Sequence, residues 1–250
     1  MTARKTVLIT GASAGIGAAT ARLAAKNGYD VGIGYRSDKE GAQSVARDVE
    51  KAGGQAVLLP GDMGKPEDVE RIFELFDTRF PKLDAFVNNA GMVDMPSRLE
   101  DMTVERIERM LRVNLTGALL AAGQAVKRMA SRYGRGGGVI VNISSVAATA
   151  GGAHQYVDYA ATKGAIDTLT KGLALENAEE NIRVCGIRPG IIETEIHAKG
   201  GNPSRAQDLA HIVPMKRPGL PIEIAEMVLW MMSDKASYVT GSTIDISGGR

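Results

Sequence analysis

Short apolar runs rich in β-branched residues alternate with longer segments of helical periodicity along nearly the whole chain. This alternation is the pattern of βαβ units, in which helices join parallel strands and cover the sheet. The segments that we expect to form strands are 5–10, 30–36, 55–62, 83–91, 137–145, 182–190 and 242–249. The pattern predicts an α/β fold with a Rossmann-type, doubly wound parallel sheet flanked by helices on both faces.

The segments between the expected strands predict helices and one long loop. Helices are expected over 16–27 and 39–53, and the most apolar stretch, 115–126, predicts a buried helix because polar residues interrupt it too often for a membrane span. The region 193–221, rich in Gly, Pro and charge, has no clear periodicity and predicts a substrate loop. Without internal repeats or a low-complexity linker, residues 1–250 are expected to form a single domain.

Composition limits the classes of partner. Thirty basic and 29 acidic residues give a formal net charge of +1, so no global field would recruit nucleic acid or an anionic membrane. We therefore expect small-molecule partners, with no nucleic acid and no membrane. The single cysteine, Cys185, cannot form an intramolecular disulfide, and the opening residues MTARKTVLIT show no signal-peptide pattern. These features predict a cytoplasmic location.

A glycine-rich turn follows the first expected strand, in the segment TGASAGIG at 10–17. Its glycines allow positive φ and a close approach of the backbone to a pyrophosphate, whose charge the following helix N-terminus favours. Their spacing differs from the dinucleotide fingerprint G-x-G-x-x-G. Taken alone, the turn is compatible with a nucleotide site and equally with a plain strand-to-helix connection.

Further short motifs follow this turn in a set order. They are GDM at 61–63, NNAG at 88–91, VNLTG at 113–117, NISS at 142–145, YAATK at 159–163 and RPGIIET at 188–194. In this order and approximate spacing the chain resembles the short-chain dehydrogenase/reductase family, and within it bacterial sugar or polyol dehydrogenases of the glucose 1-dehydrogenase type and 3-oxoacyl-carrier-protein reductases. The resemblance implies an NAD(P)(H)-dependent oxidoreductase that interconverts a secondary alcohol or sugar hydroxyl and a carbonyl by hydride transfer, within one dinucleotide-binding catalytic domain.

The family's Tyr-x-x-x-Lys signature matches Tyr159 and Lys163, whereas Tyr156 lies outside it. On a helix, this spacing puts both side chains on one face. The resemblance implies that Tyr159 is the acid/base. We expect the ammonium of Lys163, together with the charge of an oxidised nicotinamide ring, to lower the phenol pKa from about 10. Tyr156 either contacts substrate or packs at the mouth of the site.

The resemblance also implies that Ser145 stabilises the substrate oxygen, with Ser144 as the alternative. It implies that Asn114 takes part in a proton relay from Lys163 through water, although a structural role in helix geometry is equally open.

No metal is expected, because the three histidines show no metal-ligand spacing with cysteine or carboxylates and the implied mechanism needs no metal. These histidines are His154, His197 and His211.

Cofactor preference is expected to depend on the end of the second strand. Tyr35 occupies the position where NAD-selective relatives place an aspartate, and Arg36 and Ser37 follow it. Arg36 can pair with a 2′-phosphate, so NADP(H) is the preferred cofactor, unless this arginine is a solvated surface charge. Ala14 stands where many NADP-specific relatives have a second basic residue, which leaves NAD(H) possible.

The remaining cofactor contacts are implied by the resemblance alone. They are Gly11, Ser13, Ala14, Gly15, Ile16, Gly17, Asp62, Met63, Asn89, Ala90, Gly91, Lys163, Pro189, Gly190, Ile192 and Thr194. A homotetramer is expected as well, since the family is usually tetrameric. The apolar segment 224–232 and the last strand are either subunit contacts or ordinary core.

Two alternatives to a sugar or polyol dehydrogenase stay open. The resemblance to oxoacyl reductases keeps a 3-oxoacyl thioester as a substrate, while Glu193, His197 and Asn202 favour a small polyhydroxy compound. An alternative of another class is a nucleotide-binding sensor or scaffold without catalysis.

Overall fold

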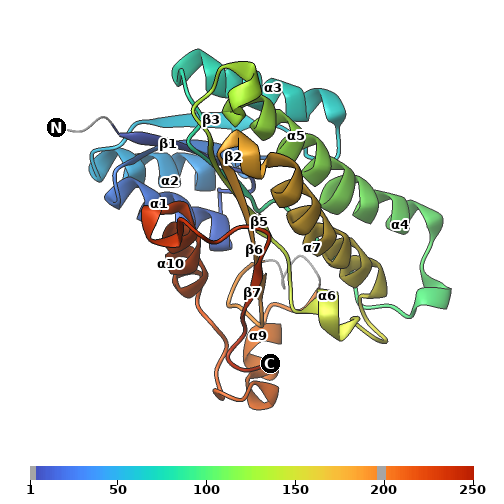
Figure 1. Cartoon of the computed structure of the whole chain (residues 1–250). Helices are drawn as coiled ribbons and strands as arrows, with labels where there is room; N and C mark the ends of the chain where they lie inside the picture. The colour runs from blue at the N-terminus through green and yellow to red at the C-terminus, as the bar shows by residue number, and fades with distance from the viewer. Residues whose placement is uncertain (1–3, 196–200) are drawn as a thin grey trace.

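The computed structural model describes residues 4–195 and 201–250 and contains a seven-stranded sheet in the order β3-β2-β1-β4-β5-β6-β7 (Figure 1). Every neighbouring pair in this sheet is parallel, which confirms the predicted α/β fold. The strands are β1 (Lys5–Ile9), β2 (Tyr29–Tyr35), β3 (Ala56–Pro60), β4 (Ala85–Asn88), β5 (Gly138–Ile143), β6 (Ile182–Pro189) and β7 (Thr243–Ile246). All lie within the predicted segments except β2, which begins one residue earlier.

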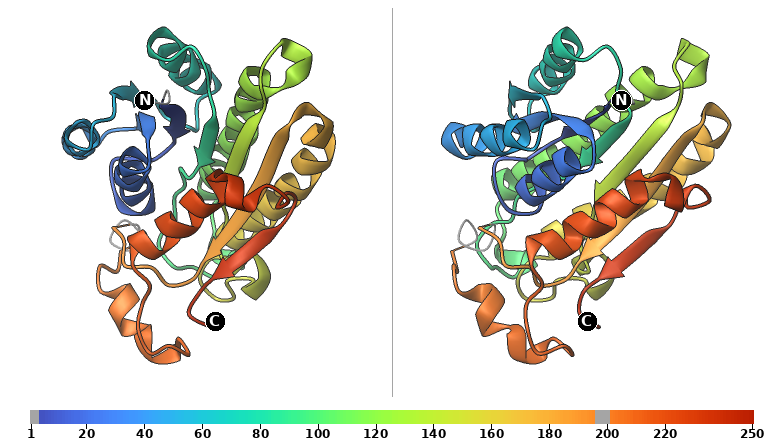
Figure 2. Two further views of the ribbon diagram at one scale, coloured as in Figure 1. Left: turned by 60° about the vertical axis from the view of Figure 1, so that its left-hand side comes forward. Right: turned by 90° about the vertical axis from the view of Figure 1, so that its left-hand side faces the viewer.

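Helices cover both faces of the sheet (Figure 2). One face carries α1 (Gly15–Lys26), α2 (Lys39–Lys51) and α10 (Pro221–Met232). The other carries α3 (Pro66–Arg79), α5 (Gly117–Met129) and α7 (Val157–Asn177). Shorter helices are η1 (Leu99–Asp101), α4 (Val104–Leu111), the π-helix η2 (Arg112–Thr116), η3 (Ser131–Tyr133), α6 (Ala147–Ala150), η4 (Ala178–Glu180), α9 (Arg205–Asp208), η5 (Ala210–Ile212) and η6 (Asp234–Ala236).

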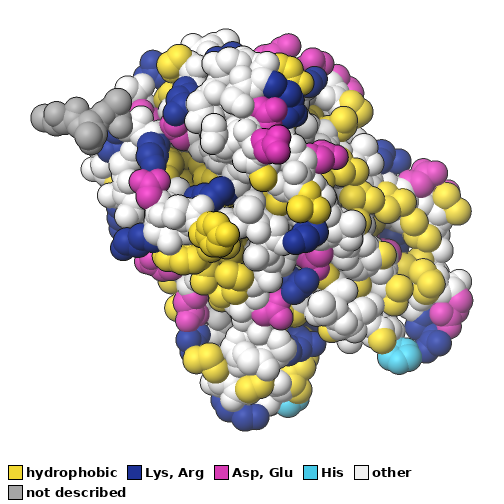
Figure 3. All heavy atoms as spheres, viewed as in Figure 1, with side chains coloured by type: hydrophobic (Ala, Val, Ile, Leu, Met, Phe, Trp, Pro, Cys, Tyr) yellow, Lys and Arg dark blue, Asp and Glu magenta, His cyan; other side chains and the backbone are white. Residues whose placement is uncertain are grey.

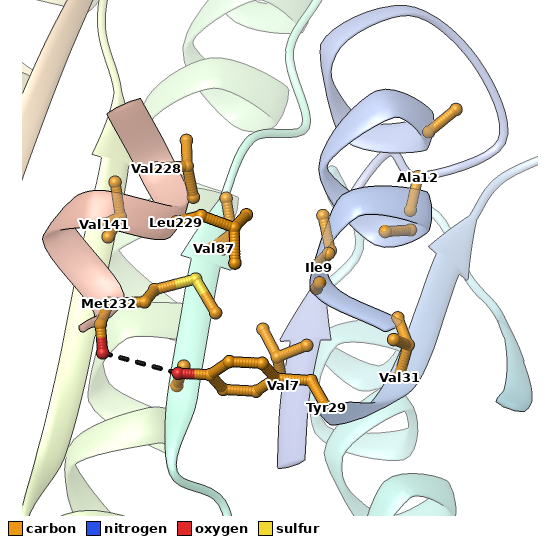
Figure 4. Packing of buried hydrophobic residues seen from close by; sticks show 14 of the residues in the cluster. Val7, Ile9, Ala12, Tyr29, Val31, Val87, Val141, Val228, Leu229 and Met232 are labelled. Atoms are coloured by element: carbon orange, nitrogen blue, oxygen red, sulfur yellow. Dashed lines mark hydrogen bonds between the residues drawn. The ribbon is translucent and has the colours of Figure 1, made fainter. Parts of the chain in front are cut away.

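The strands are apolar on both sides because each side of the sheet is covered. On the side of α1 and α10, Val7 and Ile9 pack with Val228 and Met232, and the Tyr29 hydroxyl donates to the Met232 carbonyl at 3.4 Å (Figure 4). On the opposite side, Leu8 packs in a second core with residues of α3. This two-sided burial replaces the polar–apolar alternation of a half-exposed strand by a continuous apolar run.

The apolar stretch 115–126 is buried only in part, so the prediction of a buried helix is wrong for one of its sides. Its first residues belong to the π-helix, and its remainder lies in α5. Ala121 and Ala125 face the core, whereas Leu119 and Leu120 are 45% and 40% exposed. The helical period of 3.6 residues puts these leucines on the side away from the sheet.

The predicted substrate loop, 193–221, contains the short helices α9 and η5, and α10 begins at its last residue. The segment 224–232 lies in α10, where Ile224, Val228 and Met231 are buried against the sheet and α1. These residues belong to the core, whereas Trp230 of the same segment is 37% exposed.

Charged side chains of both signs are interspersed over the face of the molecule drawn in Figure 3. This mixture agrees with the net charge of +1. Within the described residues, none of the helices has the length and apolar character that crossing a membrane requires.

Phe73 of α3 gives a test of the second core. Its ring is fully buried, with its centroid 5.4 Å from that of Phe86. We expect Phe73→Ala to lower the free energy of unfolding by about 3–5 kcal/mol, because it removes buried area and leaves a cavity. Leu175→Ala, at a position 71% exposed on α7, is the matched control. It should change that free energy by less than about 0.5 kcal/mol in urea denaturation. Equal losses in both variants would contradict the described core.

Candidate active site

A cavity of about 540 Å³ opens at the carboxyl ends of the strands, lined by the loops that follow β1 to β6. The strand order reverses between β1 and β4, and in doubly wound sheets ligands bind at such a switch point. Every residue that the resemblance assigned to the cofactor lines this cavity except Gly17. Those lining it are Gly11, Ser13, Ala14, Gly15, Ile16, Tyr35, Arg36, Ser37, Asp62, Met63, Asn89, Ala90, Gly91, Lys163, Pro189, Gly190, Ile192 and Thr194.

The glycine-rich turn is too tight for side chains at its key positions. Gly11 and Gly15 have φ of 65° and 54°, in the left-handed region that favours glycine. Gly17 lies behind the cavity lining, where an added Cβ would be 2.4 Å from the Gly11 carbonyl oxygen. Helix α1 therefore starts directly behind the turn, and its first amides can reach an anion in the cavity. The donor set fits the pyrophosphate of a dinucleotide.

Asn89 ties this turn to the loop after β4. Its side-chain amide donates to the carbonyls of Thr10 at 2.8 Å and Gly11 at 3.1 Å. In return, the Thr10 hydroxyl accepts from the backbone amides of Asn89 and Ala90, each at 3.0 Å. The NNAG segment is thus a brace between two loops as well as part of the cavity lining.

The two serines after β5 face different surroundings. Ser144 is 3% exposed, and its hydroxyl donates to the Lys163 carbonyl at 3.0 Å. Ser145 lines the cavity, and its hydroxyl oxygen accepts from the Ala147 amide at 3.1 Å. Ser145 is also the serine that hydrogen-bonds to the side chain of Tyr159. Both serines line the cavity, and Ser145 is the one that acts on the Tyr159 phenol.

Tyr159 and Lys163 lie one turn apart on α7, and both line the cavity. The Lys163 Nζ atom is 5.6 Å from the centre of the Tyr159 ring and donates to the Ile143 carbonyl at 2.7 Å. Lys163 is 5% exposed, so its ammonium has little contact with water.

Burial controls the proton affinity of both groups. It raises the pKa of Tyr159 to about 12, against a smaller lowering by the hydrogen bond with Ser145. Burial also lowers the pKa of Lys163 to about 8, and the Asp167 carboxylate opposes this change. In the chain alone, removing the phenolate from water outweighs the stabilising contacts, and the predicted lowering of the Tyr159 pKa, which includes the charge of an oxidised nicotinamide ring, stays a prediction.

Asn114 lies in the π-helix, behind the cavity lining. Its side chain accepts from the Met92 amide and donates to the Met92 carbonyl, both at 2.8 Å. A Cβ added at Gly91 would lie 3.5 Å from the Asn114 Oδ1 atom and 3.6 Å from the Lys163 Nζ atom. Asn114 therefore holds the segment at Met92 and also adjoins the space around the Lys163 ammonium, so the geometry is compatible with both predicted roles.

Arg36 is exposed at the edge of the cavity, between Tyr35 and Ser37. In the part of the chain that the structure describes, it has no salt-bridge partner. Asp38 also lines the cavity, although sequence reasoning missed it. Its carboxylate accepts from the Gly41 amide at 2.9 Å, so it is the N-cap of α2, and its place just before a predicted helix is the signal that could have found it.

The cavity lining also includes Gln155, Tyr156 and Arg205. The Arg205 guanidinium lies 5.0 Å from the Tyr156 ring centre and donates to the Gln155 side chain at 2.7 Å. Sequence reasoning missed Arg205, since no local pattern links residues fifty positions apart.

The polar residues singled out for substrate lie elsewhere. Glu193 and Asn202 are outside the cavity lining and bond to Gln207 and Asp208. His154 has a φ of 65° and contacts Arg98, whereas His197 lies outside the described residues. Over residues 4–195 and 201–250, no group of three or more potential ligands could hold a metal ion.

Comparisons with known proteins identify the family of the chain. A family model described as enoyl-(acyl carrier protein) reductase matches residues 11–250. The uncharacterized oxidoreductase YgfF of Escherichia coli K12 is 49% identical over 97% of this chain and 98% of its own length. Glucose 1-dehydrogenase 2 of Bacillus subtilis is 35% identical over 98% of this chain and 94% of its own length.

Solved structures match over nearly the whole chain. The 3-ketoacyl-(acyl-carrier-protein) reductase of Brucella melitensis, in complex with NADH, has a TM-score of 0.89 at 32% identity, covering 98% of both chains. A short chain dehydrogenase of Burkholderia cenocepacia in complex with NADP has a TM-score of 0.89 at 30% identity, covering 98% of this chain and 97% of its own.

The lowered pKa of Lys163 predicts a stability change with pH. A lysine in the unfolded chain has a pKa of about 10.4. Above pH 8 the folded chain releases this proton before the unfolded chain does, so stability should rise with pH. Relative to Lys163→Met, the wild-type free energy of unfolding should rise by about 2–3 kcal/mol between pH 8 and 10 in denaturant titrations.

Lys171→Met, at an exposed position on the same helix, is the control and should show no such difference. If the difference in free energy of unfolding between the wild type and Lys163→Met also stays constant with pH, the Lys163 pKa is not lowered.

Proposed function

The chain belongs to the short-chain dehydrogenase/reductase family and is an oxidoreductase that acts on CH–OH groups with a nicotinamide cofactor, and we propose that it uses Tyr159 as acid/base and prefers NADP(H). The observation that carries this proposal is the convergence of Ser145, Tyr159 and Lys163 in one cavity at the carboxyl edge of the sheet. These side chains come from a strand end and from one face of a helix, which are rigid supports.

The proposed roles follow from the chemistry of each side chain. The bound nicotinamide supplies the acceptor or donor of hydride. Ser145 donates a hydrogen bond to the substrate oxygen, where negative charge develops. Tyr159 takes the proton from an alcohol during oxidation and returns it to the carbonyl oxygen during reduction. The Lys163 ammonium stabilises the phenolate that is formed. Asn114 is proposed to take part in a proton relay from Lys163 through water.

The raised pKa of Tyr159 favours the phenol over the phenolate in the chain alone. A phenol is the form that donates a proton, so it suits carbonyl reduction directly. In the oxidative direction, Tyr159 needs the positive charges around it to reach the phenolate form, which gives Lys163 its proposed importance.

The preference for NADP(H) is supported by the side chains after β2. Arg36 is exposed at the cavity edge without a salt-bridge partner among the described residues, and Tyr35 carries no carboxylate, whereas the Asp38 carboxylate lines the same cavity and accepts from the Gly41 amide. A guanidinium can bind a phosphate through two parallel hydrogen bonds. NAD(H) remains a second cofactor in this proposal, because Ala14 contributes no further cation.

For the substrate, we propose a secondary alcohol or sugar hydroxyl. Gln155 and Arg205 bring hydrogen-bonding groups to the substrate end of the cavity, beside the Tyr156 ring. The similarity to a glucose 1-dehydrogenase supports a sugar, and the similarity to a 3-ketoacyl reductase makes a 3-oxoacyl thioester the second candidate. We further propose a single catalytic domain over residues 1–250, with a substrate loop at 193–221. The protein is proposed to be a homotetramer with a cytoplasmic location.

Tyr159→Phe tests the acid/base assignment. The variant lacks the transferable proton, so kcat should fall by about 10²–10⁴-fold with the substrate that the wild type turns over fastest. NADPH binding, measured by fluorescence, should remain. Tyr156→Phe is the matched control, and it should change mainly KM. Equal losses of kcat in both variants would undo the assignment.

Arg36→Ala tests the cofactor preference. Losing a charge-assisted contact to the 2′-phosphate should lower kcat/KM for NADPH by about 10–100-fold and leave that for NADH nearly unchanged. The control is Arg47→Ala, an exposed arginine of α2 outside the cavity lining. An equal effect of Arg36→Ala on both cofactors would contradict recognition of the 2′-phosphate by this arginine.

A further inference from the structure

Asp167 lies one helical turn beyond Lys163 on α7, and we propose that its carboxylate is a positioning residue that keeps the buried ammonium of Lys163 protonated for the reaction. On a helix, side chains four residues apart share a face, so Asp167 lies on the same side of α7 as Lys163. The inference rests on the proposed role of Lys163 and adds the group that maintains its charge.

The two oxygens of Asp167 have different surroundings. Oδ2 accepts from the Arg188 Nε atom of β6 at 2.8 Å. Oδ1 is buried and has no hydrogen-bond partner among the described residues. Arg188 in turn donates to Asp245 of β7 at 3.0 Å. One oxygen is thus anchored to the sheet through a chain of ion pairs, while the other, which shares the charge of the carboxylate, has no donor within the described residues.

Lys163 needs such a neighbour because it is 5% exposed and its ammonium donates to a neutral acceptor, the Ile143 carbonyl. A buried ammonium loses its hydration, and this loss favours the neutral amine. The Asp167 carboxylate acts in the opposite direction and raises the pKa of Lys163, which burial lowers to about 8. Without Asp167, the pKa of Lys163 would fall further, and the neutral amine would already predominate at a lower pH.

Many of the other charged groups on elements that pack against α7 have partners of their own, whereas Glu105 of α4, Lys127 of α5 and Glu179 of η4 are in no ion pair within the described residues. Tyr159 carries no charge near neutral pH, since its pKa lies at about 12. Arg183 of β6 donates to the carbonyls of Met231 and Ser233, away from the cavity. The paired groups are Arg106 with Asp158, Arg112 with Glu108, Arg128 with Asp77, and Arg132 with Glu180. Asp167 is the carboxylate whose charge acts on Lys163.

Protonation of Lys163 matters for the proposed chemistry because only the ammonium stabilises the phenolate of Tyr159. An anchored carboxylate would therefore extend the pH range of turnover toward higher pH. This role involves no contact of Asp167 with substrate or cofactor, and Asp167 is absent from the residues that line the cavity.

The test replaces Asp167 by Asn in the full-length protein and follows the titration of Lys163 by NMR, with lysine labelled with ¹³C at Cε. Lys163→Arg identifies the Lys163 signal by its loss. We expect Asp167→Asn to lower the titration midpoint of Lys163 by about half a pH unit or more, and Asp167→Glu to restore most of it.

Asp245→Asn is the control, because it removes the outer ion pair but leaves the bond between Asp167 and Arg188. Its Lys163 midpoint should stay near that of the wild type. A midpoint in Asp167→Asn equal to that of the wild type would overturn the proposal. If Asp167→Asn fails to fold, Asp167→Ser provides a second neutral side chain with the same expected shift.

Turnover gives a separate readout. With the fastest substrate of the wild type, the alkaline limb of the kcat profile should move to lower pH in Asp167→Asn, whereas a purely structural defect would lower kcat equally at all pH values. Absence of turnover in the wild type would contradict the proposed function, but the NMR titration would still decide whether Asp167 controls the proton on Lys163.

Discussion

The parallel pairing of β1 with β4 brings the loops after both strands to one edge of the sheet, and the whole candidate site depends on this pairing. Strand order reverses at this pair, so the helices that follow the two strands leave toward opposite faces and a cavity remains between the loops. Asn89 and Thr10 fix the two loops to each other through backbone and side-chain hydrogen bonds. Gly17 then lets α1 start against the turn, because any side chain there would meet the Gly11 carbonyl.

Burial shapes the chemistry of this edge. It keeps the Tyr159 proton on the phenol and makes the Lys163 ammonium costly to maintain. Both effects oppose the use of Tyr159 as a base. The charges that keep Lys163 protonated are therefore important for forming the Tyr159 phenolate. Asp167, anchored by Arg188, supplies a negative charge from behind the site, while the cavity itself stays free for cofactor and substrate. In this arrangement the sheet also positions a charge, since Arg188 of β6 holds the Asp167 carboxylate in place.

The features that sequence reasoning predicted are those that local spacing determines. Strand positions follow from short apolar runs, and the shared face of Tyr159 and Lys163 follows from the helical period. Contacts between distant segments could not be predicted in this way. The bond from Arg188 to Asp167 and the stacking of Arg205 on Tyr156 each require the folded arrangement. The effect of burial on the Tyr159 pKa could not be predicted because no spacing reveals burial, and the exposed side of α5 was missed because its leucines resemble core residues.

The central claim is that the cavity catalyses hydride transfer with the help of Tyr159, and absorbance of the reduced nicotinamide at 340 nm tests it most directly. NADP(H) and NAD(H) would be compared in parallel against aldoses, polyols, simple ketones and a 3-oxoacyl thioester. The account predicts turnover with at least one of these groups, and faster turnover with the phosphorylated cofactor. Cofactor binding without any change in absorbance across the panel would contradict it and favour a nucleotide-binding protein without catalysis.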